Sequence, residues 1–167
     1  MGLTVTAMSI TIRLIFMKAI LRNNNLTESQ NVTLGYPAEH ECCFELTIGQ
    51  EYTVLGINCL STSRINKGTA FLLRDDIGRC SFVPICLLEV SNPSPSKFWV
   101  ARIDNEFDFC LWPKEFCIEY FLDDLTNGIP EVVAAFDQVC RELDAENEFQ
   151  PLPPNTPHLS STKTPGQ

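Results

Sequence analysis

Carboxylates are the side chains of this sequence best placed to do chemistry, because histidine, the usual acid–base residue near neutral pH, occurs only twice. Asp104, Glu106 and Asp108 alternate along the chain, so they share one face if a strand runs through them. The spacing is similar to the start of a calcium loop, but the required glycine and the distal glutamate are missing. The pattern allows a divalent-cation site or an acidic strand surface, and we expect the surface.

Other catalytic or cofactor chemistry is poorly supported. The segment 39–43, Glu-His-Glu-Cys-Cys, holds ligand-type residues, but structural zinc needs paired cysteine spacings and no second pair follows. The other histidine, His158, lies in a proline-rich end, and Asp75-Asp76 before Ile77-Gly78 is typical of a hairpin turn. The sequence has no glycine-rich phosphate loop. We therefore predict a protein without enzymatic activity, metal or cofactor.

Charge is distributed unevenly along the chain. The formal net charge is −9, yet residues 1–103 carry eight acidic and nine basic side chains. Residues 104–148 carry thirteen acidic side chains and only two basic ones, Lys114 and Arg141. This balance disfavours nucleic-acid binding through phosphate contacts. It indicates either a solvated surface or a face that docks on a basic protein, where opposite fields speed encounter.

The predicted partner-binding residues lie in this acidic half or just before it. Aromatic side chains are concentrated there and lie among acids, which favours core packing or a protein anchor over base stacking. For docking on a basic partner we select these positions: Asp104, Glu106, Asp108, Glu119, Asp123 and Asp124, with Trp99 or Trp112 as the apolar anchor.

The cysteines and the N-terminus indicate a cytoplasmic protein. Eight cysteines stand at irregular spacings, several inside apolar strings where cysteine acts as a small hydrophobe, so we expect reduced thiols. Residues 1–16 have no charged start typical of a signal peptide, and Arg13 and Lys18 interrupt the apolar run that a membrane span would need. These residues are either an overlong start or an extra strand, with Met17 as the alternative beginning.

Short strands with tight turns are predicted between residues 17 and 90. A first strand covers 17–22, a polar loop covers 23–41, and further strands are expected at 44–48, 52–57, 70–73, 80–83 and 87–90. Such spacing favours a small barrel or sandwich. Residues 91–96, with two prolines among small polar residues, read as a linker.

The second half is predicted as a hairpin followed by a helix. Residues 98–112 alternate as two strands, and apolar residues at three- and four-residue spacing over 129–143 predict an amphipathic helix. Residues 150–167 hold five prolines and are expected to be a disordered tail. The predicted architecture is α+β: one domain over 17–149, with a barrel at 17–90 and an acidic hairpin-plus-helix part at 98–149.

Three segments resemble small bacterial and phage proteins with a Src-homology-3-like barrel: 46–54 (LTIGQEYTV), 72–78 (LLRDDIG), and 82–90 (FVPICLLEV). The resemblance implies the second strand, a central hairpin and the closing strand of an antiparallel barrel. In its acidic character the chain is also similar to immunity proteins, which implies a toxin domain as the basic partner. A carboxylate-dependent hydrolase using a divalent cation, and a structural accessory protein of a phage or secretion system, remain the alternatives.

Overall fold

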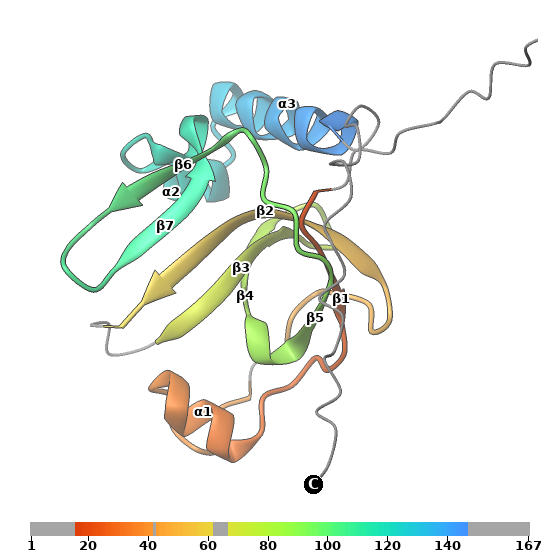
Figure 1. The fold of residues 1–167 in the computed structure, drawn as a ribbon, viewed down its shortest axis with the longest axis vertical. Helices are drawn as coiled ribbons and strands as arrows, with labels where there is room; N and C mark the ends of the chain where they lie inside the picture. Colours follow the sequence, from red (N-terminus) through yellow and green to blue (C-terminus); the bar gives the residue numbers. More distant parts are fainter. Residues whose placement is uncertain (1–15, 42, 62–66, 147–167) are drawn as a thin grey trace, which may run out of the picture.

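The fold is α+β, with one antiparallel sheet of seven strands and three helices. The computed structural model describes residues 16–41, 43–61 and 67–146. Its strands are β1 (Lys18–Leu21), β2 (Glu51–Leu60), β3 (Gly68–Arg74), β4 (Cys80–Pro84), β5 (Leu88–Asn92), β6 (Trp99–Ile103) and β7 (Phe109–Pro113). Its helices are α1 (Glu28–Leu34), α2 (Phe121–Thr126) and α3 (Pro130–Glu146), with short 3₁₀ turns η1 (Ile85–Leu87) and η2 (Lys114–Cys117). In Figure 1, α3 and α1 lie at opposite ends of the sheet.

The long strand β2 organises the sheet. Five strands follow the order β4-β3-β2-β1-β5, and the β6–β7 hairpin joins through β7, which also pairs with β2. β4 and β5 end the path without pairing with each other, so the described strands form an open sheet. Gly56 allows β7 to pack here, because a Cβ at this position would lie 2.7 Å from Cδ1 of Trp112.

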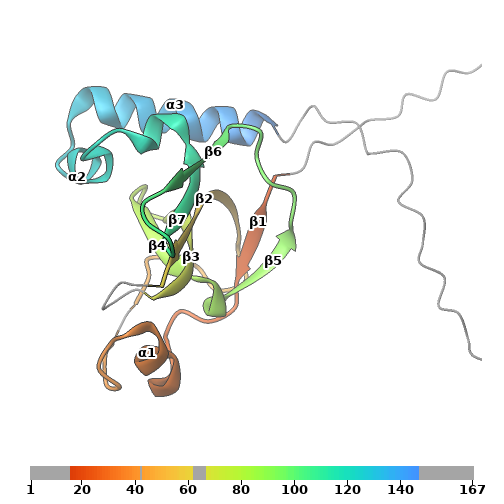
Figure 2. The same cartoon turned by 60° about the vertical axis from the view of Figure 1, so that its left-hand side comes forward.

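The sheet separates two hydrophobic cores. In β3, the alternation of side chains sends Phe71 and Leu73 into an inner core with Leu21 and Val83, and sends Leu72 to the opposite side. There an outer core forms against η2, α2 and α3, around Phe136. Figure 2 shows α2 and α3 together on one side of the sheet. The helices are therefore packed on the sheet through a shared core.

Several predicted elements are confirmed. β1, β3, β4, β5 and the β6–β7 hairpin lie where the pattern placed strands, and the turn at 75–78 contains Gly78 at φ 86°. The helix predicted over 129–143 is α3, which runs three residues further. The predicted overlong start or extra strand (1–16) and disordered tail (150–167) lie outside the described residues, except for Phe16, which is buried in the outer core.

Two predictions in the first half are wrong. Residues 23–41 contain α1, which begins with a capping box in which Thr27 and Gln30 exchange backbone and side-chain hydrogen bonds. Residues 44–48 are not a strand. There, the side chain of Asn24 accepts from the N–H of Phe44 and donates to the carbonyl of Leu46, which occupies groups that a neighbouring strand would bond.

Candidate functional site

The turn between β6 and β7 holds three of the predicted contact acids, but not on one strand face. β6 ends at Ile103, and the chain reverses over residues 104–108. Asp104 and Glu106 are exposed, whereas Asp108 is buried and accepts hydrogen bonds from the backbone N–H of Ser61 at 2.7 Å and from the Asn105 side chain at 2.8 Å. The predicted row of three carboxylates is therefore wrong, because Asp108 fastens the turn to the end of β2.

Neither predicted tryptophan is an exposed anchor. Trp112 is only 7% exposed and lies in the outer core beside Phe82, with ring centroids 6.0 Å apart. Trp99 is half-buried at the margin of the inner core. Both rings contribute to packing because β7 is an interior strand and β6 begins next to the inner core.

Arg102 pairs with one of the predicted acids, Asp104, and shares a hollow with two others, Glu119 and Asp123. Its Nε lies 2.9 Å from Oδ1 of Asp104, and its guanidinium carbon lies 5.2 Å from the centre of the Trp112 ring. The Asp104 carboxylate hydrogen-bonds this guanidinium and raises the pKa of Arg102. The same arginine lines a shallow hollow of about 270 Å³ together with exposed Glu119 and Asp123. We call Asp104, Glu119 and Asp123 the acidic rim.

The remaining selected acids lie apart from this rim. Asp124 is half-buried in the first turn of α2, and Glu106 stands at the tip of the hairpin. Neither side chain lines the hollow.

Tyr120, at the edge of the hollow, has an unusual backbone. It precedes α2 with φ 61° and ψ 12°, the left-handed region, and is the only non-glycine with positive φ among the described residues. A bulky residue in this region is strained. Its side chain is nevertheless 66% exposed, and nearby Ile118 is 65% exposed. Neither property is predictable from the sequence, since the apolar string Phe116-Cys117-Ile118 is typical of buried residues and tyrosine has no preference for such a turn.

The helical layer that carries Glu119 and Asp123 is strongly anionic. Residues 114–146, comprising η2, α2 and α3, contain nine acidic and two basic side chains. Arg141 donates a hydrogen bond to the side-chain oxygen of Gln138 on the same helix, at 2.9 Å. The field over this layer is therefore negative and attracts a cationic surface.

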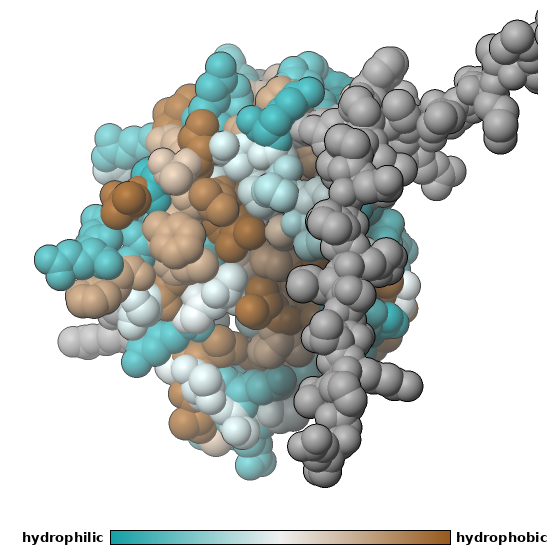
Figure 3. Space-filling view, in the orientation of Figure 1, coloured by the Kyte–Doolittle hydropathy of each residue, from teal (hydrophilic) through white to brown (hydrophobic). Residues whose placement is uncertain are grey.

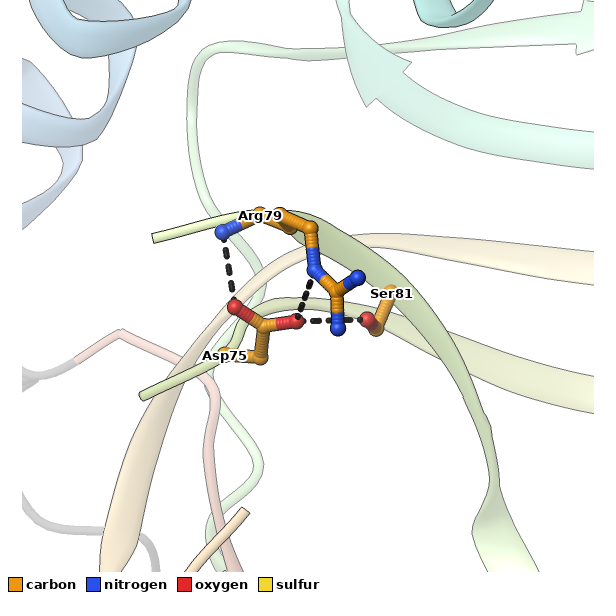
Figure 4. A network of polar contacts seen from close by, with 3 residues as sticks. All are labelled: Asp75, Arg79 and Ser81. Atoms are coloured by element: carbon orange, nitrogen blue, oxygen red, sulfur yellow. Dashed lines mark hydrogen bonds and ion pairs between the residues drawn. The ribbon is translucent and has the colours of Figure 1, made fainter. Parts of the chain in front are cut away.

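A larger groove of about 640 Å³ lies between the β3–β4 hairpin and the α2–α3 pair. Its two arginines are already engaged: Arg74 Nη2 lies 3.0 Å from Asp137, and Arg79 bonds the buried carboxylate of Asp75 through both Nε and its backbone N–H (Figure 4). Ser81 donates to the same carboxylate at 3.2 Å. Burial raises the pKa of the Cys80 thiol in this groove, so the groove supplies neither a free cation nor a reactive thiolate.

The described residues do not gather the ligands of a metal site. No group of three or more histidine, cysteine or carboxylate side chains is placed to hold an ion in the part of the chain that the structure describes. His40 instead stacks on Tyr36, with ring centroids 4.6 Å apart. The seven described cysteines are free.

Within the described ranges, none of the helices has the length and apolar character needed to cross a bilayer.

No protein-family model, curated protein or solved structure matches the chain. Function must therefore be inferred from the geometry of this chain alone.

Proposed function

We propose that this chain is a non-catalytic binding module that docks on a basic protein through the acidic rim and Tyr120. The observation that carries the proposal is Tyr120, whose large ring stands in solvent on a strained backbone between two exposed carboxylates, Glu119 and Asp123. Strain of this kind costs stability and is concentrated at functional positions. Tyrosine is also among the residues that contribute most to binding at protein interfaces.

The rim suits a lysine- or arginine-rich surface. A cation placed over the face of an exposed tyrosine gains about 0.5–1 kcal/mol, and flanking carboxylates add charge-assisted hydrogen bonds. Ile118 offers apolar area beside the ring, which supports a contact with an apolar centre and a charged border. Arg102 is already paired with Asp104, which leaves Glu119 and Asp123 to meet the partner.

The finer form of this proposal is an immunity protein built on a Src-homology-3-like core that occludes the active site of a basic toxin. Three placements support the core: β2 as the second strand, the β3–β4 hairpin in the middle, and β5 at the end of the five-strand path. The anionic helical layer supports the basic partner, because a toxin that acts on nucleic acid carries a cationic active-site surface.

The test compares what the purified chain retains from extracts of its native cells. The test variant carries Glu119→Lys and Asp123→Lys, and the control carries Glu39→Lys and Glu41→Lys, an equal charge change on exposed acids outside the helical layer. We expect a basic protein to be retained by the wild type and the control, to be lost by the test variant, and to elute as salt is raised, since exposed charges are screened. Equal retention by all three chains, or an acidic partner, would overturn the proposal.

A further inference from the structure

Strand β6 is a free edge of the sheet. Within the described residues it pairs only with β7. The N–H of Asp104 donates to the carbonyl of Asp108 at 3.0 Å, and hydrogen-bonded residues alternate along an antiparallel strand. Ala101 and Ile103 therefore point their backbone N–H and C=O groups away from β7. Edges of this kind are templates for pairing with another strand.

One face of the hairpin is apolar and exposed. Ile103 and Phe109 lie opposite each other across the hairpin, as do Ala101 and Leu111. Ile103 is 76% exposed, and Phe107 in the turn is 62% exposed. This face continues the side of the sheet that forms the inner core, but here no element of the described chain covers it; Figure 3 shows apolar side chains gathered over the hairpin region. Soluble proteins normally protect such an edge with charges or proline on the strand.

The strand is complementary to a second copy of itself. In an antiparallel pair centred on Ala101, the two Ala101 residues exchange hydrogen bonds, and Ile103 of each strand lies opposite Trp99 of the other, on the same face. This register requires the backbone N–H and C=O groups of Ala101 and Ile103 to point away from β7, as they do. A two-fold axis perpendicular to the sheet then joins the two apolar faces into one.

Charge at the ends of β6 favours the same arrangement. Lys97 precedes the strand, with its Nζ 5.0 Å from the Phe98 ring centre, and Asp104 and Glu106 follow it. Antiparallel pairing brings the cationic end of each strand beside the anionic end of the other, twice by symmetry. A parallel pair would instead place like charges together.

We propose that two copies of this chain associate through antiparallel β6–β6 pairing centred on Ala101, which makes a continuous sheet and covers Ile103. Of the acidic rim only Asp104 lies at this edge, while Glu119, Asp123 and Tyr120 lie beyond β7, so the inference does not depend on the proposed function. Repulsion between two chains of formal charge −9 opposes the contact at low ionic strength. Association is therefore measured near 0.15 M salt, where the Debye length is about 8 Å.

Sedimentation velocity of the full chain tests the proposal with two variants. Ile103→Lys places a charge on the edge and is expected to shift a concentration-dependent dimer to monomer. Ile48→Lys changes an equally prominent apolar residue, 62% exposed in the turn before β2, and is expected to remain dimeric. Circular dichroism establishes that both variants are folded. A wild-type chain that stays monomeric up to its solubility limit, or two variants that dimerise alike, would overturn the proposal.

Amide hydrogen exchange separates the second copy from other occupants of the edge. We expect the Ala101 and Ile103 amides to gain protection as the chain concentration rises, while the Arg102 amide, which faces β7, is protected throughout. Protection of Ala101 and Ile103 that is independent of concentration would assign the edge to a segment of the same chain and overturn the dimer. As a further requirement, Lys97→Glu should weaken association and Lys97→Glu with Glu106→Lys should restore it.

Discussion

The Tyr120→Gly variant is expected to be more stable to unfolding than the Tyr120→Ala variant. At φ 61° a residue with a Cβ carries about 1–2 kcal/mol of strain that glycine does not have. Glycine in turn lowers the free energy of unfolding by about 0.4–1 kcal/mol, because it gives the unfolded chain greater conformational freedom. The difference leaves Tyr120→Gly more stable than Tyr120→Ala by about 1 kcal/mol. Loss of the ring contributes equally to both variants, because both remove it.

The assay is urea unfolding of both variants with a common slope, so that midpoints report the free energy of unfolding directly. The same comparison at Ala134, exposed in the second turn of α3, is the control. There Ala134→Gly is expected to cost about 1 kcal/mol, the ordinary helix preference. The predicted result is a reversal of sign between the two positions. If alanine were at least as stable as glycine at position 120, the left-handed backbone and the strain inferred from it would be refuted.

Three further predictions concern buried carboxylates and thiols. Asp108→Ala should cost about 1–3 kcal/mol in urea unfolding, because the Ser61 and Asn105 donors lose their buried acceptor. Asp104→Ala, at an exposed ion pair, should cost less than about 1 kcal/mol, and equal costs would contradict the assignment of Asp108 to the fold. Asp75→Ala should likewise lower the unfolding midpoint by the equivalent of about 1–3 kcal/mol, and an unchanged midpoint would show that the network in Figure 4 does not hold the β3–β4 turn. Burial raises the pKa of Cys140 to about 12, so its thiol favours folding below pH 9 and stability is lost as pH rises from 9 towards 12, by up to about 1.4 kcal/mol per pH unit. Stability should fall less steeply with pH in the Cys140→Ala variant than in the wild type. Parallel curves of stability against pH for these two chains would argue against the raised pKa of Cys140.

The local sequence pattern was sufficient to predict elements that bury a single face. The apolar stripe of α3 and the alternation in β3 are direct consequences of helix and strand periodicity, so both elements were predictable. The β3–β4 turn was predictable because Asp75, Asp76 and Gly78 supply the residues that such turns require.

The parts of the fold that the pattern did not predict depend on contacts between segments that are distant in the sequence. Phe44–Ile48 alternates like a strand, but Leu46 fills the inner core while Asn24, far away in sequence, bonds the backbone. Helix α1 does carry a signal in the sequence, the Thr27–Gln30 capping box, although the polar composition of the segment predicts a loop.

The acidic rim was only partly predictable. Composition located the negative charge in the second half, but could not tell that Asp108 is buried or that Trp112 is a core residue, because both follow from the pairing of β7 with β2. The exposure and positive φ of Tyr120 are tertiary properties of the junction between η2 and α2.

The most direct test of the proposed docking surface is a hydrogen-exchange footprint of the chain, free and bound to the basic protein that it retains. We expect protection to increase over residues 118–124, which carry Tyr120 and two acids of the rim, and we expect Tyr120→Ala to reduce the affinity by at least tenfold, equivalent to about 1.4 kcal/mol. A footprint confined to α1 or to the inner strands, with unchanged affinity of the Tyr120→Ala chain, would contradict it.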